Sequence, residues 1–113
     1  MSDAARLPEM TPTELKERLD QEQPVVLVDV REPHEWQIAD LGEYGPVRMP
    51  MGEFLERMRE LDPSANVVVY CRSGGRSAWA VRQLLHAGYS KVFNLKGGIL
   101  AWRDEVDPSL SAY

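Results

Sequence analysis

Two continuous apolar runs constrain the fold of this chain more than any other feature. Val25-Val26-Leu27-Val28-Asp29-Val30 follows Pro24, and Val67-Val68-Val69-Tyr70 stands in the second half of the sequence. Runs of β-branched residues without polar alternation are typical of strands buried on both faces, as in a parallel sheet. Stretches with apolar residues at helical spacing separate these strands. The pattern therefore predicts an α/β fold, a parallel sheet covered by helices on both faces.

The remaining elements follow from local signals. Thr11-Pro12-Thr13-Glu14 predicts a helix start, with Thr11 as N-cap, Pro12 at the first helical position and Glu14 completing a capping box. Further helices are expected over 51–61, over 78–87 with Gly88 as its end, and from Gly97-Gly98 through Trp102. We also expect a turn or short helix over 33–37, a loop over 42–46, short strands over 47–49 and 91–95, and a polar tail over 107–113.

Length and composition limit the classes of function that this chain can have. With 113 residues, 43% of them hydrophobic and 27% charged, the chain predicts one globular domain. Because no apolar run reaches the length of a membrane span and residues 1–6 lack the apolar core of a signal peptide, we expect a cytoplasmic protein. One cysteine and two histidines argue against a disulfide or a structural zinc site, and no metal or cofactor is expected. The net charge of −5 argues against nucleic-acid binding.

Polar groups fall at the carboxyl ends of both strong strands. Asp29 ends the first run and Cys71, the sole cysteine, follows the second. Ligands of parallel sheets bind outside the carboxyl ends of the strands, so these two residues are expected at one rim. The sequence after Cys71 is Arg72-Ser73-Gly74-Gly75-Arg76-Ser77, followed by a helical stretch. Unpaired N–H groups at a helix start, a glycine pair that can turn N–H groups inward and two arginines all favour a thiolate, so Cys71 is predicted to be a nucleophile.

Three blocks, in order and with matching spacing, resemble the signature blocks of the rhodanese (sulfurtransferase) domain: Asp29-Val30-Arg31-Glu32, the loop from Cys71 to Arg76, and Asn94-Leu95-Lys96-Gly97-Gly98 with Trp102. The resemblance implies a three-layer fold with a five-stranded parallel sheet. It divides the chain into an N-terminal segment 1–10, a rhodanese-like domain 11–104 and a tail 105–113. The stretch 101–110 resembles the end of the rhodanese half of fused adenylyltransferase–rhodanese proteins, which serve sulfur-carrier activation.

The resemblance also implies a chemistry and a set of residue roles. Cys71 would take a sulfane sulfur from thiosulfate or another donor, hold it as a persulfide and pass it to a thiophilic acceptor. Arg76 joins Cys71 as a catalytic residue that fixes the loop, and Arg72 faces solvent and incoming anions. Ser73, Gly74, Gly75 and Ser77 complete the substrate-binding loop. Ser73 and Ser77 are expected either to cap the helix or to hydrogen-bond the sulfur, with helix capping favoured for Ser77. Asp29 and Arg31 are expected to support the rim as an ion pair. A small anionic donor and a protein donor or acceptor are the partners implied.

Two alternatives stay open. A cysteine phosphatase also has a thiolate and an arginine, but its loop is longer than the four residues between Cys71 and Arg76. The other alternative is a non-enzymatic sulfur-relay or interaction module that serves a sulfur-carrier/adenylyltransferase pathway, and an inactive interaction module would need no reactive thiol. One departure from the family concerns the segment after Arg31, where many rhodaneses have Gly-His-Ile-Pro-Gly-Ala. This chain has Ile38-Ala39-Asp40-Leu41-Gly42-Glu43-Tyr44-Gly45-Pro46-Val47, without the histidine.

Overall fold

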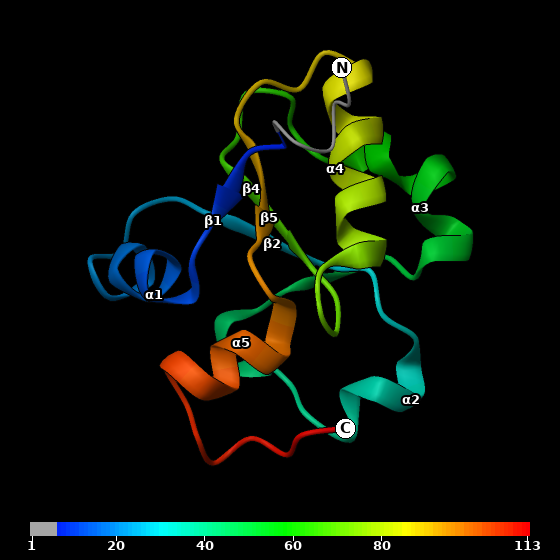
Figure 1. Cartoon of the computed structure of the whole chain (residues 1–113). Helices are drawn as coiled ribbons and strands as arrows, with labels where there is room; N and C mark the ends of the chain where they lie inside the picture. The colour runs from blue at the N-terminus through cyan, green and yellow to red at the C-terminus, as the bar shows by residue number, and fades with distance from the viewer. Residues whose placement is uncertain (1–6) are drawn as a thin grey trace.

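The computed structural model describes residues 7–113, in which a five-stranded sheet separates two layers of helices (Figure 1). All strand pairs are parallel, which confirms the predicted fold class. The strand order is β1 (Glu9–Met10), β5 (Val92–Leu95), β4 (Val67–Tyr70), β2 (Val26–Asp29) and β3 (Val47–Arg48). Strand β1 was not predicted, because two residues are too few to show a period. Residues 1–6 of the N-terminal segment lie outside the described residues.

The helices cover both faces of the sheet. Helices α1 (Pro12–Asp20) and α5 (Gly98–Glu105) lie on one face, and α3 (Met51–Arg57) and α4 (Gly75–His86) lie on the other (Figure 1). Helix α2 (Pro33–Trp36) follows β2 near the carboxyl ends of the strands, and two 3₁₀ turns are formed by Gly42–Tyr44 and Met58–Glu60. Alternate residues of β4 point into the two layers: Val67 and Val69 join the core under α3 and α4, and Val68 and Tyr70 join the core under α1 and α5. All four residues are fully buried, as the continuous apolar run indicated.

The predicted capping box is present at the start of α1. The Thr11 hydroxyl accepts from the Glu14 N–H at 3.1 Å, and the Glu14 carboxylate accepts from the Thr11 N–H at 3.0 Å. Helix α4 departs from the prediction, because it begins at Gly75 instead of Ala78. Gly74 adopts a left-handed conformation with φ 113° and turns the chain directly from the loop into the helix. Arg76 and Ser77 therefore belong to the first turn of a helix and not to an extended loop.

Helix α5 approaches the loop after β4 closely enough to exclude a side chain. The N–H of Ile99 donates to the Cys71 carbonyl at 3.0 Å, and the N–H of Leu100 donates to the Arg72 carbonyl at 3.1 Å. Between these elements lies Gly98, with φ 65°, where an added Cβ would stand 2.5 Å from the Arg72 carbonyl oxygen. The first turn of α5 thus fixes the main chain that carries Cys71.

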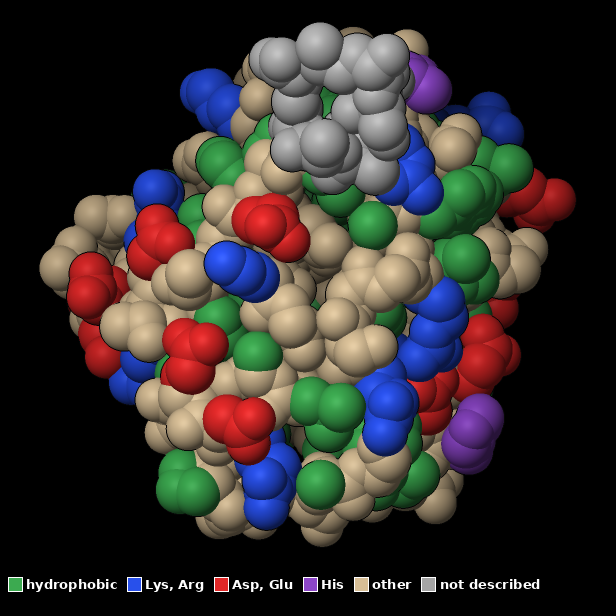
Figure 2. All heavy atoms as spheres, in the orientation of Figure 1, with side chains coloured by type: hydrophobic (Ala, Val, Ile, Leu, Met, Phe, Trp, Pro, Cys, Tyr) green, Lys and Arg blue, Asp and Glu red, His purple; other side chains and the backbone are tan. Residues whose placement is uncertain are grey.

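Charged side chains of both signs are interspersed on the face drawn in Figure 2. This mixture accompanies a net charge of −5 over the whole sequence. Between residues 7 and 113, none of the helices combines the length and the apolar character that crossing a membrane requires.

The close approach of α5 to the loop predicts that Gly98→Ala destabilises the protein more than the same substitution at another left-handed glycine. Gly45 has φ 64° with nothing within 4 Å of an added Cβ, so Gly45→Ala isolates the cost of the left-handed backbone, about 1–2 kcal/mol. Gly98→Ala carries the same cost and adds overpacking of about 1–3 kcal/mol. Urea unfolding of both variants measures the difference. Equal losses in the free energy of unfolding would mean that the loop shifts to accommodate the added methyl group at no cost.

Candidate active site

The Cys71 sulfur faces donors from the start of α4. Its Sγ atom lies 3.1 Å from the N–H nitrogen of Gly74, 3.5 Å from that of Ser77 and 3.3 Å from the Ser77 hydroxyl. The residue is 1% exposed, so these contacts are poorly screened by water. Main-chain N–H groups at a helix start carry partial positive charge. The arrangement therefore suits a sulfur that bears negative charge.

Ser77 contacts the sulfur instead of capping the helix. The N-cap of α4 is Gly74, and no side chain makes a capping hydrogen bond there. The expectation that Ser77 caps the helix is therefore wrong, because the early start of α4 places Ser77 inside the first turn, with its side chain buried and turned toward Cys71. Two other loop residues, Ser73 and Gly75, are exposed.

Arg76 is paired with a carboxylate that the sequence analysis did not single out. Its Nη1 and Nη2 atoms lie 2.7 and 2.8 Å from the two carboxylate oxygens of Glu35, on α2. Hydrogen bonds from Arg76 lower the pKa of Glu35 from 4.5 to about 2, against the opposing effect of burial. The same pair raises the pKa of Arg76. Arg76 thus clamps the first turn of α4 to α2, and its positive charge is largely balanced.

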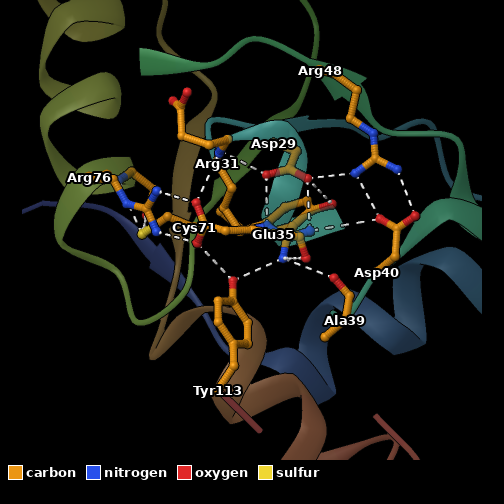
Figure 3. A network of polar contacts seen from close by, with 12 residues as sticks. Asp29, Arg31, Glu35, Ala39, Asp40, Arg48, Cys71, Arg76 and Tyr113 are labelled. Atoms are coloured by element: carbon orange, nitrogen blue, oxygen red, sulfur yellow. Dashed lines mark hydrogen bonds and ion pairs between the residues drawn. The ribbon is translucent and has the colours of Figure 1, made fainter. Parts of the chain in front are cut away.

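Asp29 and Arg31 form the ion pair that the sequence predicted, and both side chains are fully buried. Oδ1 of Asp29 lies 3.0 Å from Nε of Arg31, and Oδ2 lies 3.0 Å from Nη2 (Figure 3). The third nitrogen, Nη1, donates to the carbonyls of Glu35 at 3.2 Å and Ala39 at 2.9 Å, and to the Tyr113 hydroxyl at 3.0 Å. Burial opposes the charge of Arg31, but these partners raise its pKa above the ordinary value. The pair therefore also fixes α2 and the segment after it.

The C-terminal residue joins this network. Besides accepting from Arg31, the Tyr113 hydroxyl donates to the Glu35 carboxylate at 3.0 Å (Figure 3). Arg72 is exposed, as expected, but its guanidinium lies over the Tyr113 ring at 5.3 Å and its Nε donates to the Tyr113 main-chain oxygen. The expected polar tail thus ends in contact with the loop that carries Cys71. Nothing in its composition indicates this, because a single tyrosine at the end of a short segment without regular spacing has no periodicity.

The segment that replaces the family's Gly-His-Ile-Pro-Gly-Ala has its own contacts. Ala39 and Leu41 are buried in the core, and between them Asp40 accepts from Nη2 of Arg48 at 2.8 Å. Nη1 of Arg48 reaches Oδ2 of Asp29 at 2.6 Å. The segment therefore supports the Asp29 carboxylate through Arg48. Among the residues that the structure describes, no cluster of three or more His, Cys, Asp or Glu is placed to hold a metal ion.

The chain belongs to the rhodanese-like domain family, whose model matches residues 11–105. The probable adenylyltransferase/sulfurtransferase MoeZ of Mycobacterium tuberculosis is 34% identical over 110 residues, which cover 97% of this chain but only 28% of MoeZ. A sulfurtransferase of Allochromatium vinosum is 43% identical over 88 residues, covering 78% of this chain and 80% of that protein. The crystal structure of a rhodanese-like domain protein from Staphylococcus aureus matches with a TM-score of 0.79 and 27% identity, covering 95% of this chain and 99% of the other.

The lowered pKa of Glu35 predicts a pH-dependent contribution to stability. Because the pKa falls from 4.5 to about 2 on folding, the contribution is complete above about pH 5 and is lost as the pH falls toward 2. The difference in free energy of unfolding between wild type and Glu35→Gln should therefore shrink by about 2 kcal/mol between pH 7 and pH 3. Urea unfolding at both pH values measures it.

Glu53→Gln provides the matched control. Glu53 pairs with Arg57 at 3.2 Å, but its side chain is 58% exposed. Exposed pairs contribute little to stability, so the Glu53→Gln difference should stay small at both pH values. If the difference in free energy of unfolding between wild type and Glu35→Gln is also the same at pH 7 and pH 3, Arg76 does not hold Glu35 ionised.

Proposed function

We propose that this chain is a rhodanese-type sulfurtransferase in which Cys71 carries the sulfur as a persulfide. The observation that carries the proposal is the placement of the Cys71 sulfur against two main-chain N–H groups and a hydroxyl. Such donors stabilise an anionic sulfur, and both the thiolate and the persulfide are anionic. The names of the relatives, a sulfurtransferase and a probable adenylyltransferase/sulfurtransferase, support the same chemistry.

The proposed reaction proceeds in two displacements. The Cys71 thiolate attacks the outer sulfur of thiosulfate, a bond forms between the two sulfurs, and sulfite leaves with the electron pair of the broken sulfur–sulfur bond. A nucleophile such as cyanide or an acceptor thiolate then attacks the outer sulfur of the persulfide, and the Cys71 thiolate is the leaving group. Dividing the transfer in this way is covalent catalysis and gives ping-pong kinetics.

The arginines serve this reaction in different ways. Arg76 is a positioning residue, because its two hydrogen bonds to Glu35 hold the helix turn that supplies the N–H of Ser77 to the sulfur. Arg72 is exposed, its Nε donates to the Tyr113 main-chain oxygen and its guanidinium lies over the Tyr113 ring. From that position we assign its charge to attracting an incoming anionic donor. The loop glycines let the main chain wrap the small sulfur closely.

A second candidate function is relay of sulfur between proteins. The match to part of MoeZ favours it, because the name of that protein combines sulfur transfer with adenylyl transfer. In this case the donor is a partner's persulfide, whose outer sulfur the Cys71 thiolate attacks while the partner's thiolate leaves, and the acceptor is a partner's thiolate that attacks the outer sulfur of the Cys71 persulfide. We propose a cytoplasmic location, where reductants keep a lone thiol available for repeated transfer.

Incubation with thiosulfate should load one sulfur on Cys71. Intact mass should rise by the mass of one sulfur atom, ~32 Da, and a thiol reductant should reverse it, since thiols attack sulfane sulfur. Cyanide should release thiocyanate from the loaded protein. Cys71→Ser retains size and hydrogen bonding but offers no thiolate, so it should take up nothing. Sulfur uptake by that variant would refute the assignment of Cys71 as carrier.

Kinetics of two variants should separate the arginine roles. Arg76→Ala frees the first turn of α4 from Glu35, so kcat should fall by roughly tenfold or more, as when a charge-assisted pair is broken. Arg72→Ala removes an exposed charge, so the KM for thiosulfate should rise with little change in kcat. Added salt should reduce the Arg72 effect, because exposed charges are screened beyond ~10 Å at 0.1 M. Identical changes in both variants at every salt concentration would contradict this division.

A further inference from the structure

Asn94 connects the two parts of the loop that contact the Cys71 sulfur. It lies on β5, is 4% exposed and makes two side-chain hydrogen bonds. Its Nδ2 atom donates to the Gly74 carbonyl at 3.1 Å, and its Oδ1 atom accepts from the Ser77 hydroxyl at 2.5 Å. Gly74 and Ser77 are the same residues whose N–H groups face the sulfur. A single buried amide therefore contacts both ends of the sulfur site.

The orientation of the Asn94 amide is determined by Gly74. The Gly74 carbonyl can only accept, so the amide must present its NH₂ group there and its oxygen to Ser77. A serine hydroxyl has one proton and lies near two groups, the Asn94 oxygen and the Cys71 sulfur, 3.3 Å away. While Asn94 accepts that proton, Ser77 presents only lone pairs to the sulfur. This arrangement matches a protonated thiol, which donates to Ser77.

We propose that Asn94 is a positioning residue that couples the protonation state of Cys71 to the direction of the Ser77 hydroxyl. When the thiol proton leaves to solvent, the hydroxyl turns about its Cβ–Oγ bond and donates to the anionic sulfur. Throughout, the bond from Asn94 to the Gly74 carbonyl keeps the Gly74 N–H aimed at Sγ. The inference rests on the proposed function for its role in sulfur transfer, where the thiolate and persulfide would gain the hydroxyl donor.

The charged groups around the sulfur are common to the wild type and to variants at Asn94. Arg76 interacts electrostatically with Cys71, and Glu35 pairs with Arg76. Arg72 turns to Tyr113. A change in the alkylation of Cys71 in Asn94→Ala therefore reports the hydrogen bonds of the amide and not a new ionic neighbour.

The test is a double-mutant cycle on Ser77→Ala and Asn94→Ala, read as the pH midpoint of iodoacetamide alkylation of Cys71. Ser77→Ala should raise the midpoint more in the Asn94→Ala background, where the hydroxyl is free to donate to the sulfur, than in the presence of Asn94. The shifts that Ser77→Ala causes with and without Asn94 should differ by about 0.4 pH unit or more. This difference corresponds to the lower end of the interaction free energies found between residues in contact. Equal shifts in both backgrounds would overturn the proposal. Circular dichroism checks that each variant is folded.

Asn94→Asp keeps the shape of the side chain and provides the second measurement if an alanine variant does not fold. The aspartate cannot donate to the Gly74 carbonyl and adds negative charge beside the sulfur, so the midpoint should rise, and kcat for thiosulfate should fall with a rise in the KM of this anionic donor. An unchanged midpoint would overturn the proposal. Alkylation needs no sulfur donor, so a failure of the proposed function, seen as no mass gain in wild type, is distinguishable from a failure of this inference.

Discussion

The site depends on the buried guanidinium of Arg31. A charge removed from water is costly unless a counter-ion and hydrogen bonds replace its hydration. Arg31 has no exposed surface, and its partners are the Asp29 carboxylate, two main-chain carbonyls and the Tyr113 hydroxyl. These partners come from β2, α2, the segment after α2 and the end of the chain. Satisfying one cation therefore fixes four segments relative to the carboxyl end of the sheet.

Two sets of hydrogen bonds hold the loop that carries the sulfur. On one side, α2 carries Glu35, whose carboxylate holds Arg76 and with it the first turn of α4. On the other side, the first turn of α5 donates to the carbonyls of Cys71 and Arg72. The loop after β4 is thus held between two helix starts, each entered through a glycine with positive φ, Gly74 and Gly97. Preorganised donors cost little reorganisation when charge appears on the sulfur.

The sequence predicted the parts of this arrangement that have a period or a short motif. The buried runs gave β2 and β4, the capping box gave the start of α1, and the Asp29–Arg31 pair was expected at the rim. It could not predict Glu35 or Tyr113 as members of the site, and it placed Asn94 in a signature block without assigning a role to its side chain. Glu35 lies 41 residues from Arg76 and Tyr113 lies 78 residues from Glu35, so their contacts depend on the folded topology and leave no local pattern. Ser77 was misassigned because a left-handed glycine, not a side chain, starts α4.

The interactions that surround the sulfur in the folded chain differ from those that the sequence predicts. From the sequence, two arginines are expected to add full positive charge beside Cys71. In the folded chain the Arg76 charge lies within 2.7 Å of the Glu35 carboxylate, and the Arg72 guanidinium lies over Tyr113. Exposed charges are screened by salt, whereas buried N–H dipoles of the main chain are screened much less. In the proposed function the N–H groups of Gly74 and Ser77 are therefore assigned the main stabilisation of an anionic sulfur, and the arginines are assigned to shape and to approach. On that proposal the site keeps its affinity for anionic sulfur across ionic strengths, while the rate at which an anionic donor arrives is sensitive to salt.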